Sequence, residues 1–402
     1  FLTWLIYFVP ISLISGSLIL NLNLILIAIF LFIYFFLNKN FFYYLNLNWV
    51  KVAILILICQ ILSSIINDVN LDSLIRSIGL IKFITLTTAI LIIFELNYKN
   101  FENFTRILFL VALFVIVDSL IQFSFGKNIF GNEYTLGRLT SIFGDEKIVG
   151  AFLAKIGFLI LILPFMIIKN TKYLNIIIFT TISILLITIL LSGERMASLL
   201  FILGITIYYF YKSFFNYKNS FYFVIIGIII LVIFSSSDNV LKRFKEINHE
   251  RFGLTKELKI NNSVWGAHFL AAYEIFKNYP ILGVGPKNFR LEVCKKKYEN
   301  INSTKATKRC STHPHNIILE ILSEHGIIGM ILFLILLYTI LKGSNLFNEI
   351  QFLTFISLLI FVWPIGTSGS IFTSWNGTFL WVNFAFFLFI KRCQKFKKNK
   401  YF

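Results

Sequence analysis

The sequence predicts an all-α polytopic membrane protein with about twelve transmembrane helices, and three properties of the chain indicate this. Of the 402 residues, 57% are hydrophobic and only 14% are charged, and the mean hydropathy is +0.81. Soluble domains carry roughly 25% charged residues, so this chain is too apolar to face water over its whole surface. Long apolar runs also recur from one end of the chain to the other. Intrinsic disorder, a disulfide scaffold and a cytosolic enzyme are therefore excluded.

The apolar runs set the expected helices, because a helix that crosses the hydrocarbon core needs ~20 predominantly apolar residues. We expect spans at residues 3–20, 22–37, 50–66, 74–95, 104–125, 149–168, 174–191, 196–212, 221–236, 315–341, 350–366 and 376–391. The first two runs are nearly fused. Since the apolar pattern continues along the whole chain, a cleaved signal peptide is not indicated. The sequence opens on Phe1 rather than Met, which leaves open whether residues precede it.

The positions of Lys and Arg predict that both termini are cytoplasmic, because cytoplasmic loops carry an excess of these residues. With the N-terminus inside, the inside loops hold nine basic residues and the C-terminal tail holds six, fifteen in total, against five in the short outside loops. The inside residues are Lys39, Lys51, Lys99, Arg106, Lys169, Lys172, Lys212, Lys218, Lys342, Lys391, Arg392, Lys395, Lys397, Lys398 and Lys400. The outside residues are Arg76, Lys127, Arg138, Lys147 and Arg195.

One long polar stretch, residues 237–314, separates the ninth and tenth runs and is placed outside by this orientation. It contains fifteen basic and seven acidic residues, a local balance of +8. A basic outer domain suits an anionic ligand such as a lipid pyrophosphate. A codon bias toward Ile, Phe, Asn and Lys explains the single lysines equally well. The chain thus divides into nine helices in residues 1–236, a large periplasmic loop at 237–314, and three helices with a basic cytoplasmic tail in residues 315–402.

The large loop contains its own signals. Apolar residues at helical spacing between Trp265 and Lys277 predict an amphipathic helix that lies on the membrane surface. Cys294 and Cys310 follow, with fifteen residues between them. An oxidising periplasm permits a disulfide between them, which we favour over metal binding because two cysteines without a second ligand pair are a weak metal signal.

Charged groups in or beside spans are costly and are therefore candidate functional groups. Several titratable groups gather at the outer ends of spans: Arg138, Asp145, Glu146, Glu194, Arg195, His313 and His315. Lys82, Asp118 and Lys155 lie within spans, where either pairing with one another or a catalytic role would explain them.

The most specific string is His313-Pro314-His315-Asn316, followed by an apolar run. Proline starts a helix well, so the string predicts that His315 lies at a helix N-terminus on the outer membrane surface. The helix dipole then lowers the pKa of the imidazole and favours its neutral form, which a general base requires. A histidine at an interface can equally serve as a hydrogen-bonding anchor.

This segment resembles the signature of the O-antigen ligase and O-antigen polymerase superfamily. In that signature, a His followed by Asn, Ser or Gln precedes a Gly-x-x-Gly pair after nine residues, as His315-Asn316 precede Gly326 and Gly329 here. The resemblance extends to the twelve-span plan, the large outer loop, the string Gly-Val-Gly-Pro-Lys-Asn-Phe-Arg at 283–290 and the Ser-Gly-Glu-Arg turn at 192–195. It covers a family-like catalytic region at about 130–340.

The resemblance implies an inverting, metal-independent glycosyltransferase without cofactor in the bacterial inner membrane, with its active site facing the periplasm. It implies an undecaprenyl-diphosphate-linked glycan as donor and a lipid A-core or lipid-linked glycan as acceptor, among membrane lipids. Arg195 matches the first pyrophosphate-binding Arg and His315 matches the base that deprotonates the acceptor hydroxyl. Arginine forms bidentate contacts with phosphate oxygens, and a pyrophosphate leaving group needs this charge stabilisation more than acid catalysis.

The chain departs from the family at the second essential Arg, which falls ahead of or within the surface helix of the large loop. Lys259, Asn261, Asn262 and His268 stand there. Either His268 or Lys259 substitutes, or Arg290 reaches in from the following turn, and we favour Arg290. Arg138 is a further candidate for phosphate binding, and His313 and Asn316 are candidate supporting residues. For Arg138 and Arg290, a simple surface position is the alternative.

Three rival functions remain at this point. An O-antigen polymerase performs the same displacement with a second lipid-linked repeat as acceptor. A transporter or lipid flippase would use Lys82, Asp118 and Lys155 as its pathway, although no paired broken helices indicate one. A non-catalytic assembly scaffold would show no turnover. The chain contains no Walker loop, no Asp-x-Asp motif and no nucleophile elbow, and we expect no nucleic-acid partner.

Overall fold

The computed structural model describes residues 1–67, 71–135, 137–236, 238–245 and 263–396, and within these ranges it is helical, without any β-strand. The first helices are α1 (Leu2–Ser12), α2 (Ser17–Asn38), α3 (Phe41–Leu45), α4 (Asn48–Asn67), α5 (Leu71–Ile78), α6 (Ile81–Leu96), α7 (Tyr98–Phe125), α8 (Val149–Ile160) and α9 (Ile162–Ile167). The later ones are α10 (Thr171–Leu191), α11 (Arg195–Phe215), α12 (Phe221–Ser236), α13 (Asp238–Lys245), α14 (Val264–Asn278), α15 (Phe289–Glu292), α16 (Ile317–Leu341), α17 (Glu349–Phe361) and α18 (Ser374–Phe396).

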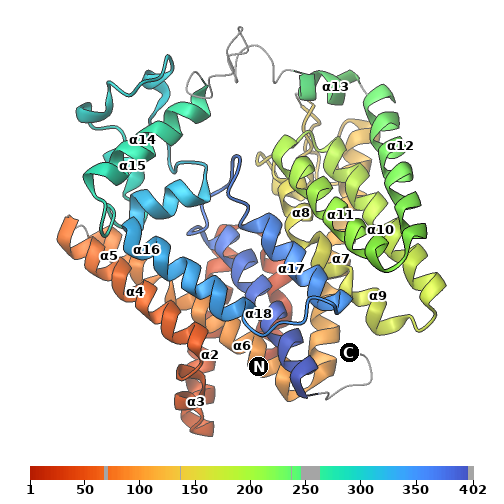
Figure 1. Cartoon of the computed structure of the whole chain (residues 1–402), viewed down its shortest axis with the longest axis horizontal. Coiled ribbons are helices and arrows are strands. Elements are labelled where there is room, and N and C mark those ends of the chain that lie inside the picture. Colours follow the sequence, from red (N-terminus) through yellow and green to blue (C-terminus); the bar gives the residue numbers. More distant parts are fainter. Residues whose placement is uncertain (68–70, 136, 237, 246–262, 397–402) are drawn as a thin grey trace.

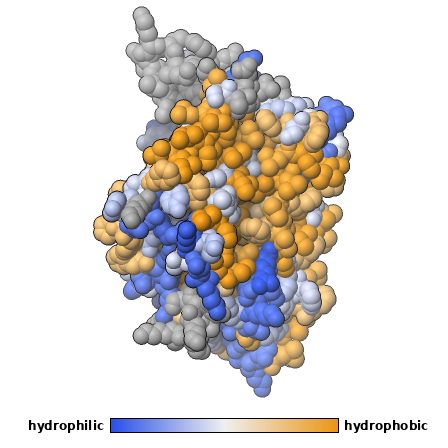
Figure 2. Space-filling model, turned by 90° about the vertical axis from the view of Figure 1, so that its right-hand side faces the viewer, coloured by the Kyte–Doolittle hydropathy of each residue, from blue (hydrophilic) through white to orange (hydrophobic). Residues whose placement is uncertain are grey.

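Eight helical stretches in the described part of the chain are long and apolar enough to cross a membrane. They are α2, α4, Ser73–Leu96, α7, Val149–Ile167, α10, α11 and α16, and α1, α12 and α17 are shorter apolar helices. Side chains such as Phe210 and Leu231 are exposed, and Figure 2 shows a broad apolar surface on one face of the molecule. The predicted class, an all-helical membrane protein, is confirmed. The number of helices that cross the membrane stays a prediction.

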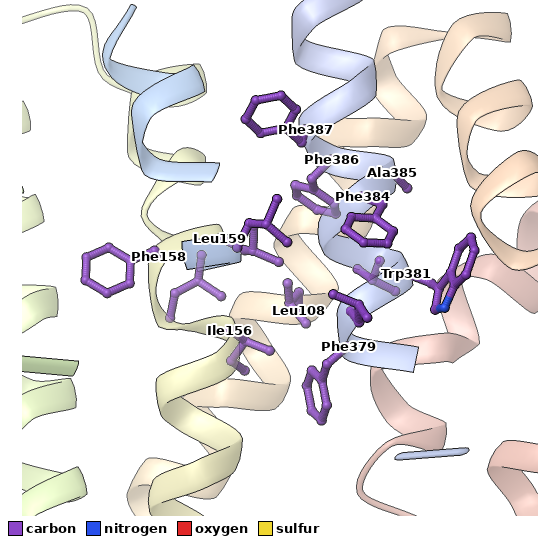
Figure 3. Close-up of a cluster of buried hydrophobic side chains, with 14 of the residues drawn as sticks. Leu108, Ile156, Phe158, Leu159, Phe379, Trp381, Phe384, Ala385, Phe386 and Phe387 are labelled. Carbon is purple, nitrogen blue, oxygen red and sulfur yellow. The ribbon is translucent and has the colours of Figure 1, made fainter. Parts of the chain in front are cut away.

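The core forms around α18, which lies between α6, α17 and α8 (Figure 1). Its buried aromatic residues Phe379, Phe384 and Phe386 face Leu108 of α7 and Ile156 of α8 (Figure 3). Aromatic pairs contribute about 0.5–1.5 kcal/mol beyond their buried area when they meet edge to face. Phe386 makes such contacts with Phe94 and Phe101, at centroid distances of 5.9 and 5.2 Å. This aromatic packing fixes the central helix on which the outer turns are built.

Several predicted boundaries are wrong. The run at 3–20 is interrupted after Ser12, because Gly16 adopts φ +101° and starts α2 instead. The run at 350–366 ends as a helix at Phe361, and residues 362–373 form an outer turn. The tenth helix begins at Ile317 with Asn316 as its cap, so His315 precedes the helix. Hydropathy detects the apolar runs but not the glycines and caps that end helices inside them.

Helices α14 and α15 lie at the opposite end of the molecule from the N-terminus and the end of α18. In Figure 1, α14 and α15 lie at the upper end, whereas the N-terminus and the end of α18 lie toward the lower end. The helix predicted between Trp265 and Lys277 is present as α14, and Ser263 caps it by accepting from the backbone N–H of Gly266 (2.8 Å). Its buried face carries Ala267, Ala271 and Ile275 and packs against α15 and α16. This face packs against neighbouring elements of the chain rather than lying on a free membrane surface.

Candidate active site

Three histidines and a tryptophan meet at the outer end of α16. Measured between ring centroids, His315 lies 3.9 Å from His313, 5.3 Å from His268 and 4.6 Å from Trp265. His313 and His315 come from the string before α16, whereas Trp265 and His268 come from α14. The contact between α14 and α16 therefore builds this histidine cluster, which we define as His268, His313 and His315.

The backbone of His315 is held in an unusual conformation. Its φ is +60°, in the left-handed region that costs a non-glycine residue about 1–3 kcal/mol. Asn316 follows as the N-cap of α16, and its side-chain oxygen accepts from the N–H groups of Ile318 and Leu319, both at 3.1 Å. The carbonyl of His315 accepts from the N–H of Ser368 (2.8 Å). The cap and this backbone bond together hold the imidazole outside the helix.

The electrostatics of the cluster favour neutral imidazoles. Burial lowers the pKa of His315 to about 3, and His313 and His268 add to this because two cations cannot easily lie so close. Burial also lowers the pKa of His313 and of His268. The direction agrees with the sequence-based expectation, but the main cause is burial rather than a helix dipole. A neutral His315 can accept a proton, and its Nε2 already lies 3.2 Å from the hydroxyl of Ser311.

A second group of residues surrounds Arg195, the first residue of α11. Gly193 adopts φ +69°, and a Cβ there would lie 2.3 Å from the carbonyl of Gly137, so the turn at 192–195 presses against the segment that carries Arg138. The Arg138 guanidinium donates to the carbonyl of Lys147 (2.6 Å). Glu194 accepts from the backbone N–H of Gly150 (2.6 Å) at the start of α8. The structure therefore brings Arg138 and the Arg195 turn together.

The turn at residues 364–368 contacts both the histidine cluster and the residues around Arg195. A Cβ on Gly366 would lie 2.3 Å from the methyl carbon of Met196, the neighbour of Arg195. The side-chain amide of Asn316 donates to the carbonyls of Pro364 (2.8 Å) and Gly366 (3.3 Å). Sequence reasoning missed this turn, because residues 350–366 were assigned to a span. Pro364 and Gly366 were the available signal.

The segment 280–289 is fixed to a kink in α16. Gly326 has φ +62° and ψ −165° inside the helix, which frees the N–H groups of Ile327 and Ile328 to donate to the carbonyls of Pro280 (2.9 Å) and Ile281 (3.3 Å). The N–H groups of Val284 and Gly285 donate to α16 carbonyls, both at 2.9 Å. Gly326 is required here, because a Cβ would lie 2.3 Å from the carbonyl of Ile281. The family-like glycines thus serve a backbone junction.

Glu324 completes this junction with its side chain. The carboxylate accepts from the N–H of Lys287 (2.8 Å) and from that of Phe289 (3.4 Å), and the residue is only 1% exposed. Lys287 itself has φ +57°. Sequence reasoning assigned no role to Glu324 or Lys287, although Lys287 lies in the string at 283–290. The sequence signal for Glu324 would have been a carboxylate directly before His325 and Gly326, where the helix bends.

The remaining predicted residues are placed as follows. Arg290 lies half-buried in α15 and makes no hydrogen bond or ion pair with the residues that the structure describes. No contact therefore brings Arg290 to the histidine cluster, whereas His268 lies within that cluster. Lys259 lies outside the described residues. Cys294 and Cys310 form a disulfide, with Cα atoms 5.2 Å apart.

Of the two alternatives for Lys82, Asp118 and Lys155, pairing with one another is not found in the structure. Asp118 accepts from Ser141 (2.6 Å), Asn128 (3.1 Å) and the N–H of Ile129 (3.0 Å), which ties α7 to the segment that follows it. The two lysines instead bind the first turn of α18. Lys82 donates to Ser374 (2.8 Å) and Asn21 (2.9 Å), and Lys155 donates to Asn376 (2.5 Å). Each charge has separate polar partners, so the structure does not connect the three into a pathway.

Comparison with known proteins finds one family model that covers this site. Residues 180–334 match the family model described as O-antigen ligase. The matched range includes the Arg195 turn, α14, the histidine cluster and the kink of α16. No curated protein matches the chain.

Proposed function

We propose a specific reaction for this chain, because residues 180–334 match the O-antigen ligase family model and the chain has the helices of an integral membrane protein. The chain moves a glycan from undecaprenyl diphosphate to a lipid A-core acceptor at the periplasmic face of the bacterial inner membrane. The reaction inverts the anomeric carbon and uses no metal ion. The observation that carries this proposal is the turn at 364–368, which contacts both the Arg195 neighbour Met196 and the His315–Asn316 pair.

His315 acts as the general base. Its neutral imidazole takes the proton of the acceptor hydroxyl, whose oxygen then attacks the anomeric carbon of the donor glycan. The bond between that carbon and the pyrophosphate oxygen breaks, and undecaprenyl diphosphate leaves with the electron pair. A histidine of pKa about 3 is a weak base. The bound pyrophosphate supplies nearby negative charge, which favours the imidazolium and raises this pKa during the reaction.

Arg195 binds the donor pyrophosphate, with Arg138 beside it. Their guanidinium groups stabilise the charge that develops on the leaving group, and charge-assisted hydrogen bonds to phosphate are the strong ones. His268 and His313 support His315, and Asn316 orients it by capping α16. Arg290 and Lys259 stay predictions as further phosphate-binding residues.

The test is transfer by the purified protein in detergent or liposomes, with polyprenyl-diphosphate-linked glycan as donor. We expect His315→Ala to lower the rate by about 10²–10⁴-fold, the usual contribution of a general base, and Arg195→Ala to lower kcat/KM by about 10–100-fold. Both variants should unfold at the wild-type temperature. Full activity in both variants contradicts the site assignment.

The choice of acceptor is tested in the same assay by supplying either lipid A-core or a second lipid-linked repeat. Transfer to lipid A-core supports the ligase, and transfer only to the lipid-linked repeat identifies a polymerase instead. The donor site is the same in both cases, so the two variants should lose activity with either acceptor.

A further inference from the structure

Lys155 is a half-buried lysine of α8 that the proposed reaction does not use, and it lies inside the apolar stretch Val149–Ile167. Its ammonium group lies 4.2 Å from the ring centroid of Trp375, 5.5 Å from that of Phe379 and 5.6 Å from that of Phe361. It forms no ion pair with a carboxylate of the described residues. A charged group in such a stretch is costly, so its contacts are the place to look for its role.

The ammonium group of Lys155 fixes the side-chain amide of Asn376, in the first turn of α18. Lys155 Nζ donates to Oδ1 of Asn376 at 2.5 Å, and Nδ2 of the same amide donates to the carbonyl of Ser370 at 3.0 Å. An ammonium group can only donate and a carbonyl can only accept, so these two partners allow a single orientation of the amide. Without the lysine, nothing at Oδ1 opposes a rotation that exchanges the oxygen and the nitrogen.

The outer turn at 362–373, which Asn376 binds, also holds the backbone of His315. The N–H of Ser368, two residues before Ser370, donates to the carbonyl of His315 at 2.8 Å. A Cβ on Gly369 would lie 2.6 Å from Nδ2 of Asn376, so the turn packs directly on the amide. The left-handed φ of +60° at His315 persists only because its surroundings determine it, and this turn is part of them.

The same turn is attached to α16 at two further points. The N–H of Ile371 donates to the Glu320 carboxylate at 3.2 Å, and the amide of Asn316 donates to the carbonyl of Pro364 at 2.8 Å. The turn is therefore bonded to the first turns of α16 on one side and to Asn376 on the other. A shift of the turn at Asn376 is transmitted to the residues that begin α16.

We propose that Lys155 is a positioning residue, which holds His315 in place through the Asn376 amide and the outer turn at 362–373. The proposal rests on the proposed role of His315 as the general base, and it adds a residue that does not touch the substrate. One support of the base then comes from the helix bundle rather than from the outer loop. This support is directional, because it needs a donor at residue 155 and an oriented amide at residue 376.

The first experiment measures glycan transfer by Lys155→Met, which keeps a long side chain without a donor, with Lys391→Met as the matched control. Lys391 is a half-buried lysine at the other end of α18, where it donates to the carbonyls of Ile340 (2.5 Å) and Lys342 (3.2 Å). We expect Lys155→Met to lower kcat by about 10–100-fold and to leave the KM for the donor unchanged, because His315 is displaced while the donor site is kept. Lys391→Met should behave as wild type. Equal kcat values for the two variants overturn the proposal.

An isosteric substitution tests the amide itself. Asn376→Asp keeps an oxygen for the Lys155 ammonium group, but it places a second oxygen against the carbonyl of Ser370, where a donor is needed. We expect kcat to fall as it does in Lys155→Met, while the new ion pair maintains the contact between α8 and α18. Wild-type kcat in Asn376→Asp overturns the proposal, because the orientation of the amide would then not matter.

A double variant separates positioning from stability. In the Lys155→Met, Asn376→Leu protein, apolar side chains replace both partners of the hydrogen bond, and the carbonyl of Ser370 still accepts from the hydroxyl of Thr373 (2.9 Å). No polar partner is left unpaired, so thermal stability should return toward that of the wild type, whereas kcat should stay low. This protein also provides the test where Lys155→Met does not fold. Recovery of stability and kcat together shows that Lys155 only stabilises the fold, and it overturns the proposal.

Hydrogen exchange separates this proposal from the proposed function. Exchange of the backbone amides is measured by mass spectrometry for wild type and Lys155→Met in detergent. We expect faster exchange in peptides that contain Ser368 and Ile371, whose N–H groups bond to His315 and Glu320, and no change in α14. This result supports the positioning role even if the wild type transfers no glycan, in which case only the proposed reaction fails. Unchanged exchange in the outer turn, or an equal increase in the turn and in α14, overturns the proposal.

Discussion

His315 combines a proposed chemical role with a conformational cost. Its left-handed backbone is maintained by the cap at Asn316 and by the bond from Ser368, and both partners lie at the outer end of the helix bundle. The sequence string was sufficient to predict His315 as the candidate base. It could not predict the burial that keeps the ring neutral, because Trp265 and His268 approach from α14, nearly fifty residues away. Local patterns identify such a residue, whereas its environment is a tertiary property.

The histidine cluster predicts how stability depends on pH. The pKa of each histidine is lowered in the folded protein, that of His315 to about 3, so the unfolded chain takes up protons first, near pH 6.5. Stability is therefore complete above pH 6.5 and is lost as the pH falls from 6.5 toward the folded values. We expect the thermal midpoint to drop between pH 7.5 and 4.5, and to drop less in a His268→Asn, His313→Asn double variant. A drop of the same size in both proteins contradicts this account.

At the scale of the element, α16 is a helix in two parts. The apolar run predicted one span at 315–341, and the Gly-x-x-Gly pair was the residue-level signal within it. The bend itself could not be predicted, because glycine also occurs in straight helices and only the packed segment at 280–285 shows what the bend is for. The same limit applies to the turn after Phe361, which hydropathy extends into a longer span.

Substitution of Gly326 tests this junction. Gly326→Ala places a Cβ 2.3 Å from the carbonyl of Ile281 and forces a left-handed alanine, so we expect a loss of roughly 2–4 kcal/mol in stability and a strong loss of transfer. Gly343→Ala is the matched control, because Gly343 has φ +75° but nothing within 4 Å of the added Cβ. Its loss should be about 1 kcal/mol, with activity retained. Thermal unfolding and the transfer assay give both values, and similar effects of the two substitutions would show that the close contact does not matter.

At the scale of the whole molecule, hydropathy predicted the class of the fold well. Every predicted apolar run overlaps a helix in the described residues, because membrane burial forces the backbone to satisfy its own hydrogen bonds. The partners of Lys82, Asp118 and Lys155 could not be predicted, since the two lysines bind residues of α18 and Asp118 binds the segment that follows α7. Hydropathy identifies the apolar segments, but it does not show which segments contact each other in the fold.

The orientation of the whole molecule in the membrane is tested by cysteine labelling. We expect Tyr273→Cys on α14 to react with a membrane-impermeant maleimide in intact cells, because the fifteen-to-five distribution of basic residues places α14 outside. Asn345→Cys, in the turn between α16 and α17, should react only after permeabilisation. Both substitutions are made in a Cys59→Ala, Cys393→Ala protein so that only the introduced thiol reacts. The reverse pattern of labelling would invert the assigned topology.

The bend at Gly326 also bears on how the sequence of this region can diverge. The half of α16 before it is bonded to segment 280–289 largely through backbone groups, which do not depend on the identity of the side chains. The exceptions are the Glu324 carboxylate and the glycines Gly283 and Gly326, where an added Cβ would meet backbone atoms at 2.3 Å. Other side chains of this segment can therefore diverge between related chains while its attachment to α16 is kept.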